Sequence, residues 1–254
     1  MLAGSFGGQS LRRMVRWHYF SSIEKHVAAG SRTLEFGCGG GNRWLAERYP
    51  VTGLEYSFEA CRVAQGIYRK SMVADVRSLP LRDQTYECVC SSFVLEHLPQ
   101  TAAEAALFEI HRILVPGGLF VALLDLECNQ PLFRHLKKHH AATYHTALIE
   151  IPGHQGLVSE QVWSSRARSA GFQVREWQLM TRFPILDLAT YAYFESVPQA
   201  AAWLKVVGRA AQWLAHSPAH ALYSLGVTAV DDVVRNLLPR SWAYRLLFVL
   251  EKAN

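Results

Sequence analysis

The 254-residue sequence has few charged side chains: Asp, Glu, Lys and Arg make up only 19% of it, and the formal net charge is +5. Its densest basic segment, Leu11–Arg16, contains three arginines. Nucleic-acid-binding proteins usually carry a more concentrated basic patch than this. We therefore expect no nucleic-acid partner.

Long hydrophobic runs are also missing. The longest uncharged stretch, Ala210–Val230, is interrupted by a proline, two histidines, a glutamine and two serines. A membrane-spanning helix needs about 20 consecutive, predominantly apolar residues. We expect no integral membrane segment, and peripheral contact with a membrane stays open.

Cysteines are few, and their number is odd: the sequence has five. Cys88 and Cys90 stand two residues apart within an apolar run, where small hydrophobic residues of a strand are expected rather than a disulfide or a metal pair. This usage favours a reducing compartment, so we expect a cytoplasmic protein.

The N-terminal segment allows two interpretations. It holds three arginines and no acidic residue before Glu24, as transit peptides do. Leu11, Met14 and Val15 would also share one face of a basic amphipathic helix. We favour the second interpretation, in which residues 1–28 form a helical cover of the mature protein.

Short apolar runs alternate with helical patterns, which predicts an α/β fold with a largely parallel sheet. The expected strands are Arg32–Phe36, Val51–Tyr56, Met72–Ala74, Tyr86–Ser91, Leu119–Leu124, Phe172–Met180 and Tyr244–Glu251. The expected helices are Asn42–Tyr49, Phe58–Arg69, Ala102–Leu114 and Glu160–Ala170. Residues 115–118 (Val-Pro-Gly-Gly) are expected to stop the third of these helices before its strand begins.

A glycine-dense turn follows the first expected strand, in Glu35–Asn42. Glycines let a ligand lie against the main chain, and Asn42 can cap the next helix. The second strand carries Glu55, whose carboxylate would lie beside this turn and could accept hydrogen bonds from a ribose diol. Together they predict an adenosine-containing ligand. Asn42 replaces the third glycine of the nicotinamide-dinucleotide fingerprint, and no Gly-Lys-Ser/Thr motif follows, which excludes a P-loop.

These blocks resemble those of the class I S-adenosylmethionine-dependent methyltransferases, particularly the small-molecule "methyltransferase domain" group. Further matching blocks are Ala74–Val76, Leu79–Leu81, Val94–Leu98 and Arg112–Gly118. The resemblance implies a Rossmann-like, seven-stranded, mostly parallel sheet flanked by helices. Residues 1–181 and 242–254 would form the S-adenosylmethionine-binding domain, and residues 182–241 a helical cap inserted before the last strand.

The resemblance also implies residues that contact the cofactor. In the family, the first motif lines the methionine and ribose, the next acidic residue holds the ribose hydroxyls, a third block holds the adenine, and the fourth strand runs beneath the methionine. The corresponding residues are Glu35, Gly37, Cys38, Gly39, Gly41, Glu55, Tyr56, Ser57, Ala74, Asp75, Val76, Ser91 and Ser92.

Methyl transfer needs an acceptor held in line with the methyl group and, for some acceptors, a group that removes a proton. His97 and Asp125 are the candidates for that catalytic role; packing and helix capping are the alternatives. Candidate acceptor contacts are His18, Tyr19, His135 and His154. The spacing of the histidines between residues 126 and 156 matches no known tetrahedral ligand set, so we expect no metal.

In the expected cap, Trp203, Val207, Ala211 and Leu214 form one apolar stripe. The stripe is explained either by core packing, by a lid over a hydrophobic acceptor, or by contact with membrane lipid. We expect methylation of an O, N or C atom of an apolar, aromatic or lipid-like small molecule.

Two other functions stay open. The protein could be a non-catalytic partner or regulatory protein that binds S-adenosylmethionine. An RNA or protein methyltransferase is disfavoured, because the sequence has no Asn-Pro-Pro-Tyr-type motif and no appended basic module. The acceptor and the oligomeric state are not predicted.

Overall fold

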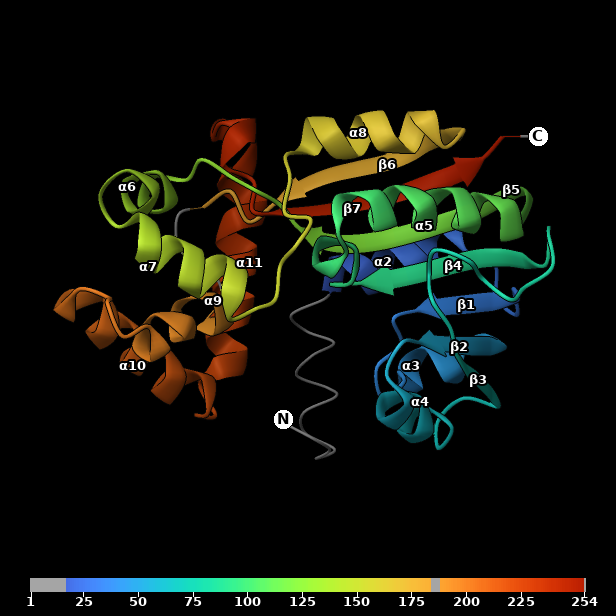
Figure 1. The fold of residues 1–254 in the computed structure, drawn as a ribbon, viewed down its shortest axis with the longest axis horizontal. Coiled ribbons are helices and arrows are strands. Elements are labelled where there is room, and N and C mark those ends of the chain that lie inside the picture. Colours follow the sequence, from blue (N-terminus) through green and yellow to red (C-terminus); the bar gives the residue numbers. More distant parts are fainter. Residues whose placement is uncertain (1–16, 184–187, 254) are drawn as a thin grey trace.

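The computed structural model describes residues 17–183 and 188–253, in which seven strands form one sheet (Figure 1). The strands are β1 (Thr33–Phe36), β2 (Val51–Glu55), β3 (Lys70–Val73), β4 (Tyr86–Ser92), β5 (Leu114–Asp125), β6 (Phe172–Met180) and β7 (Arg245–Lys252). Their order is β3-β2-β1-β4-β5-β7-β6, with β1 to β5 parallel and β7 antiparallel to both of its neighbours. The predicted Rossmann-like, mostly parallel sheet is confirmed.

Helices cover both faces of this sheet. They are α2 (Trp17–His26), α3 (Arg43–Ala46), α4 (Phe58–Ala64), α5 (Gln100–Ile113) and α8 (Glu160–Ser169). Strand residues alternate between the two apolar layers: in β7, Phe248 packs in the core with α5 and α8, and Val249 packs in the core with α2 and α3. Burying both faces explains why the strands read as continuous apolar runs.

The predicted N-terminal cover, residues 1–28, is described only in part. Its first 16 residues, including Leu11, Met14 and Val15, lie outside the described residues. The remainder contains α2, whose residues Tyr19, Phe20 and Ile23 are buried against the sheet.

The start of β5 differs from the prediction. We expected residues 115–118 to form a turn, but the strand already begins at Leu114, directly after α5. Tyr86 pairs with Leu114 and Cys88 with Leu119, so the extra residues of β5 bulge out between these pairs. Gly117 has a φ of 74°, which fits the irregular backbone of such a bulge. The Pro-Gly-Gly segment therefore interrupts the pairing without ending the strand.

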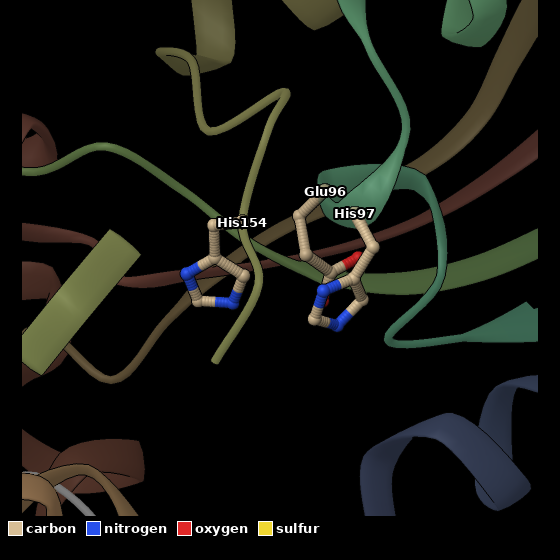
Figure 2. A group of neighbouring side chains, drawn as sticks. All are labelled: Glu96, His97 and His154. Atoms are coloured by element: carbon tan, nitrogen blue, oxygen red, sulfur yellow. The ribbon is translucent and has the colours of Figure 1, made fainter. Parts of the chain in front are cut away.

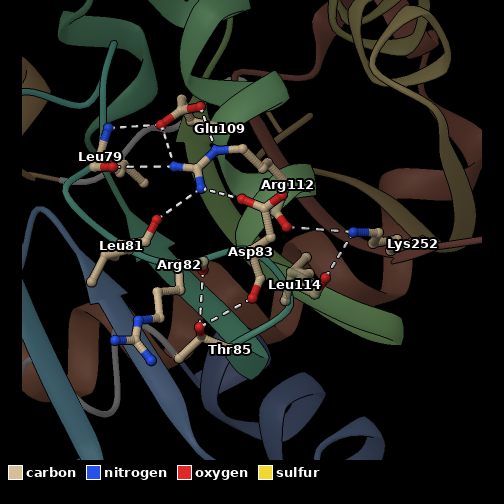
Figure 3. Close-up of polar contacts among 9 residues, drawn as sticks. All are labelled: Leu79, Leu81, Arg82, Asp83, Thr85, Glu109, Arg112, Leu114 and Lys252. Atoms are coloured by element: carbon tan, nitrogen blue, oxygen red, sulfur yellow. Dashed lines mark hydrogen bonds and ion pairs between the residues drawn. The ribbon is translucent and has the colours of Figure 1, made fainter.

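Arg112 braces the chain between β3 and β4 against α5 (Figure 3). Its guanidinium donates to the carbonyl oxygens of Leu79 (3.1 Å) and Leu81 (2.7 Å) and to the carboxylates of Asp83 and Glu109. Glu109 in turn accepts the backbone N–H of Leu79 at 2.7 Å. Lys could not reproduce this planar pattern with several donors, and the pattern fixes the Leu79–Leu81 block against α5.

A second helical layer lies at the end of the sheet where β4 and β5 finish (Figure 1). It comprises α6 (Pro131–His139), α7 (Ala141–His145), α9 (Leu188–Ala192), α10 (Ala202–Ala215) and α11 (His220–Val234). We call α9, α10 and α11 the cap, because they are inserted between β6 and β7. Phe133, Leu148, Phe194 and Leu204 form its shared core with α6. No helix in the described ranges has the length and apolarity needed to cross a membrane.

A buried carboxylate ties the cap to the sheet. Asp231 of α11 accepts the backbone N–H groups of Thr181, Arg182 and Phe183 at 2.7, 2.7 and 2.8 Å. These residues directly follow β6. The three hydrogen bonds satisfy a carboxylate that is only 6% exposed, and they fix where α11 lies relative to the sheet.

A second carboxylate ties α2 to the far edge of the sheet. Glu176 of β6 accepts hydrogen bonds from Ser22 and Lys25 at 2.7 and 2.8 Å, and its carboxylate lies 2.7 Å from Nε2 of His26. Burial raises the pKa of Glu176, but these partners and Gln178 outweigh burial and lower it to about 2. The charged form is therefore the one that the fold stabilises.

We expect Glu176→Gln to remove most of this pH-dependent stability. Because the folded-state pKa is below the ordinary value of 4.5, the contribution is complete above about pH 5 and is lost as the pH falls towards 2. A shift of this size corresponds to at most about 3 kcal/mol. Urea unfolding between pH 2 and 7 should show a flatter profile for Glu176→Gln. Glu59→Gln, at an exposed ion pair on α4, is the control; equal profiles for Glu176→Gln and wild type would contradict the assignment.

Candidate active site

The glycine-rich loop after β1 turns back over the end of β2. The N–H groups of Gly37 and Cys38 both donate to the carbonyl oxygen of Leu54, at 2.8 and 3.0 Å. Gly37 has a φ of 67°, and a Cβ on it would stand 2.4 Å from a methyl carbon of Val94. A side chain is therefore excluded at this position for two independent reasons. The loop ends at Asn42, which caps α3 as predicted.

Glu55 lies beside this loop, as the sequence predicts. Its Oε2 accepts the N–H of Gly39 at 2.7 Å, and its Oε1 accepts the N–H groups of Tyr56 and Ser57 at 2.9 and 3.2 Å. A carboxylate has about four lone-pair sites, so about one stays available for a ligand hydroxyl. Glu55 thus has two possible tasks: holding the loop and accepting from a ribose.

Asp75 follows β3 at the same edge. Arg77 binds its carboxylate through Nε at 2.9 and 3.0 Å and through its backbone N–H at 2.8 Å. These hydrogen bonds lower the pKa of Asp75 to about 2, so it is ionised at neutral pH and can only accept hydrogen bonds. Tyr56 is 75% exposed next to this region, and Ser57 caps α4. The contacts predicted for these residues with adenine remain predictions.

Tyr68 is a residue of this region that the sequence did not indicate. Its hydroxyl donates to the buried carboxylate of Glu35 on β1 and accepts the N–H of Asn42 at 2.7 Å. Burial, followed by the charge of Glu35, raises the pKa of Tyr68, so the hydroxyl keeps its proton. Tyr68 therefore links the strand before the glycine loop to the helix after it.

The end of β4 has a strained backbone. Phe93 adopts a φ of 57°, which is rare for an aromatic residue, and its N–H donates to Leu123 at 2.7 Å. Ser91, two residues before Phe93, is buried, and its hydroxyl oxygen has no hydrogen-bond partner within the described ranges. Backbone strain persists where the surrounding structure imposes it, often at functional sites.

Asp125, a predicted catalytic residue, is the last residue of β5 and pairs across the sheet with Arg245, the first residue of β7. Its Oδ1 lies 3.1 Å from Nε of Arg245, and both side chains are mostly buried. The helix-capping alternative is not observed, because Gln130 stands before α6. Asp125 is thus held by the guanidinium of Arg245.

His97, the other predicted catalytic residue, lies beside His154, a predicted acceptor contact (Figure 2). Their ring centroids are 5.0 Å apart. Nδ1 of His97 lies 3.2 Å from the carbonyl oxygen of Gly153, and Nδ1 of His154 lies 2.7 Å from that of Leu148. Burial lowers the pKa of His154, which favours its neutral form.

Glu96 lies beside His97 and is fully buried (Figure 2). Its Oε1 accepts the N–H of Asp125 at 3.3 Å. Burial, then the negative charge of Asp125, raises the pKa of Glu96 well above its ordinary value. The sequence motif contained this residue, but its burial and its contact with β5 could not be deduced from spacing.

The other predicted acceptor contacts lie elsewhere. His18 lies 3.0 Å from Asp232 of α11 and lines a small cavity of about 40 Å³ beside Arg245. Tyr19 is 1% exposed within the core, away from the lining of this cavity. His135 is exposed on α6, where its ring lies against that of His139. Of the four predicted contacts, His154 is the one next to His97.

A larger apolar cavity of about 410 Å³ lies within the helical layer. Its lining residues are Leu132, Leu188, Tyr191, Phe194, Trp203, Leu204, Val207, Ala210, Ala211, Leu214 and Tyr223. The predicted stripe of α10 faces this cavity, and Trp203 stays 48% exposed instead of packing into a core. Tyr223 also lines the small cavity beside Arg245, so the two cavities adjoin.

Comparisons with known proteins agree with this geometry. Residues 34–122 match the family model described as a methyltransferase domain. The chain carries a class I S-adenosylmethionine-dependent methyltransferase domain. The chain is similar to a demethylmenaquinone methyltransferase of Lactiplantibacillus plantarum, with 30% identity over 132 residues, 46% of this chain and 55% of that protein.

The methyltransferase domain has other relatives. A malonyl-[acyl-carrier protein] O-methyltransferase of Geobacter sulfurreducens is 29% identical over 194 residues, covering 70% of this chain and 66% of that protein. The phosphoethanolamine N-methyltransferase 2 of Haemonchus contortus, solved with S-adenosyl-L-methionine, shares the fold with a TM-score of 0.60 at 16% identity, over 98% of this chain and 58% of that one. The chain spans about half the length of the curated demethylmenaquinone methyltransferases it matches.

We expect Tyr68→Phe to weaken binding of S-adenosylhomocysteine to the methyltransferase domain by about 10- to 100-fold, because a buried carboxylate and an N–H of the glycine loop each lose a partner. Isothermal titration measures this affinity. Tyr49→Phe is the matched control, since the Tyr49 hydroxyl is also buried but lies 3.4 Å from the carbonyl oxygen of Val27. Equal losses of affinity in both variants would mean that the Tyr68 hydroxyl has no special task at the loop.

Proposed function

We propose that this protein transfers the methyl group of S-adenosylmethionine to a small molecule that combines a polar end with an apolar, lipid-like tail. The observation that carries the acceptor class is the apolar cavity of about 410 Å³ in the helical layer beyond the ends of β4 and β5. Its volume lies within the range typical of small-molecule sites.

In this proposal the cofactor binds at the ends of the first three strands of the sheet. The loop with Gly37, Cys38, Gly39 and Gly41 would hold the methionine and ribose, and Glu55 would accept one ribose hydroxyl. Asp75, held ionised by Arg77, would accept from the adenine amino group. Ligands of open α/β sheets bind at the carboxyl ends of the strands, where all these residues lie. When bound, the cofactor supplies an electrophilic methyl group.

The acceptor would bind where the cap meets the sheet. The small cavity holds roughly three water molecules by volume, so it is too small for the acceptor itself. An acceptor with its tail in the larger cavity would direct its polar end towards Asp125 and Arg245. In this proposal Asp125 is a positioning residue, because its carboxylate orients the guanidinium of Arg245.

The name of one relative supports this acceptor class, because it refers to demethylmenaquinone. A second relative is named for malonyl-[acyl-carrier protein], whose acyl group is polar and carried by a protein. The apolar stripe of α10 lines the larger cavity, and no basic side chain is among the described residues of that lining. The cavity therefore fits a lipid-like acceptor better than a nucleic acid, whose phosphates need basic partners. The contribution of the chain is to hold the acceptor in line and to keep water out, which raises the rate through proximity.

Binding and turnover distinguish the enzyme from a non-catalytic binder. We expect Glu55→Ala to lower the affinity for S-adenosylhomocysteine by about 1.5–3 kcal/mol, because hydrogen bonds to a charged carboxylate are lost. Isothermal titration provides the measurement, and Glu59→Ala, an exposed residue of α4, is the control. Unchanged affinity in Glu55→Ala would refute the ribose placement. Wild-type protein that binds S-adenosylmethionine but forms no S-adenosylhomocysteine with any acceptor of a quinol and phenol panel would support the regulatory alternative.

We expect Ala210→Trp to raise KM for long-tailed acceptors by roughly tenfold, because the indole would fill part of the larger cavity. Ala210 lines the cavity and is solvent-exposed, so the change should not disturb the core. Short-tailed acceptors and S-adenosylhomocysteine binding should be unaffected. Ala202→Trp, also exposed on α10 but outside the cavity lining, is the matched control. The tail placement fails if both variants change KM equally.

A further inference from the structure

We propose that Glu96, His97 and His154 bind a divalent transition-metal cation, with Zn²⁺ as the best-fitting ion. A carboxylate oxygen of Glu96 and one ring nitrogen of each histidine all lie within 4.8 Å of one another (Figure 2). Two imidazoles and one carboxylate form a recurrent ligand set of catalytic zinc, which keeps a further position open. His97 and His154 are 57 positions apart in the sequence, which explains why sequence spacing predicted no metal.

A second observation points to a ligand independently of the histidines. Oε2 of Glu96 is buried and has no hydrogen-bond partner among the described residues, although Oε1 accepts from Asp125. A buried carboxylate oxygen without a partner is costly, so native proteins rarely leave one unsatisfied. A bound cation would supply the missing partner.

The surroundings orient both imidazoles as metal sites require. Nδ1 of each ring lies within hydrogen-bond distance of a backbone carbonyl, of Gly153 for His97 and of Leu148 for His154. Such outer contacts fix the tautomer and leave Nε2 with a lone pair.

The backbone clamps the two halves of the site together. The carbonyl oxygen of Glu96 accepts the N–H groups of Gln155 and Gly156 at 3.0 and 2.9 Å. A Cβ on Gly156 would stand 2.4 Å from the carbonyl oxygen of Leu98, so this close approach needs glycine. Segments far apart in the chain are thus held at a fixed distance, which a ligand set demands.

The charges nearby are compatible with a cation. Asp125 lies next to Glu96, and Arg245 is already paired with Asp125. Asp125 and Arg245 neutralise each other, so a cation that displaces the proton of Glu96 would have the carboxylate of Glu96 as its counter-charge. A divalent ion would meet no unpaired positive charge among these groups.

This cation assigns a chemical class to the acceptor and rests on the proposed function. At the open position it would bind a hydroxyl or enol oxygen of the acceptor and lower the pKa of that oxygen. The proton would leave to water, the new bond from the acceptor to the methyl carbon would form, and the carbon–sulfur bond would break to release S-adenosylhomocysteine. His97 would then hold the ion instead of taking the proton itself.

The test is direct metal binding by the full chain after removal of metals with a chelator. Co²⁺ titration followed by visible absorption, and Zn²⁺ titration by calorimetry, should each give one site per chain. Glu96→Gln and His97→Ala should weaken Zn²⁺ binding by at least about tenfold, an effect seen even for residues that only orient a ligand. His139→Ala, which breaks the exposed His135/His139 pair on α6, is the control and should bind normally. S-adenosylhomocysteine binding shows that each variant is folded.

The outcomes separate this site from the proposed function. No stoichiometric site, or binding lost in His139→Ala and kept in Glu96→Gln, would overturn the cation site. Zn²⁺ binding that depends on Glu96 and His97, without methyl transfer to hydroxylated acceptors, would leave the cation site standing and contradict the proposed function. Methyl transfer that continues in chelator, together with no Co²⁺ binding, would overturn the cation site alone.

Discussion

The antiparallel strand β7 determines where the two halves of this molecule meet. It lies between β5 and β6, and its first residue, Arg245, stands opposite both Asp125 and Met180. The cap is the chain segment immediately before it, so the cap must arrive at the carboxyl ends of the parallel strands. Without β7, the edge of β5 would lose the strand that pairs with it, and Asp125 would lack Arg245, the cation that holds it.

Most strands were predictable from the sequence, because short apolar runs alternate with helical patterns along the chain. β6 was predicted at its observed bounds, and the Asn42 cap needs only residues two and three positions away. Local chemistry decides such features. The bulge in β5 was not predictable, because Pro-Gly-Gly has the same signature in a turn and in an irregular strand. Which of the two forms depends on the register with β4, a tertiary property.

The candidate site also has features that could be predicted from the sequence and features that could not. Glu55 and the glycine loop could be paired from the sequence, because parallel neighbouring strands end at the same edge. Tyr68 could not be found, since its partner Asn42 is 26 residues away and nothing in a helix-to-strand connection indicates the direction of a tyrosine. The apolar stripe of α10 was recognised, but whether it packs or lines a cavity depends on the facing helices. Trp203 shows the second case by its exposure.

Three buried carboxylates differ in how many hydrogen-bond partners the fold gives them. The carboxylate of Glu35 accepts a hydrogen bond from the hydroxyl of Tyr68, and that of Asp231 accepts hydrogen bonds from three backbone N–H groups. Both therefore have partners from the fold itself, and each joins two elements: β1 to the region after α4, and β6 to α11. Glu96 is buried more completely than either, yet the described chain offers a partner for just one of its oxygens.

That difference has a physical consequence. A fold that needed Glu96 only for packing would be more stable with an apolar residue of the same size, because an unsatisfied carboxyl group lowers stability. Its neighbours are two imidazoles that lie within hydrogen-bond distance of backbone carbonyls, and Phe93 with its positive φ precedes it by three residues, after the end of β4. The unsatisfied oxygen of Glu96 therefore destabilises the fold at a position where a bound ligand could supply the missing partner.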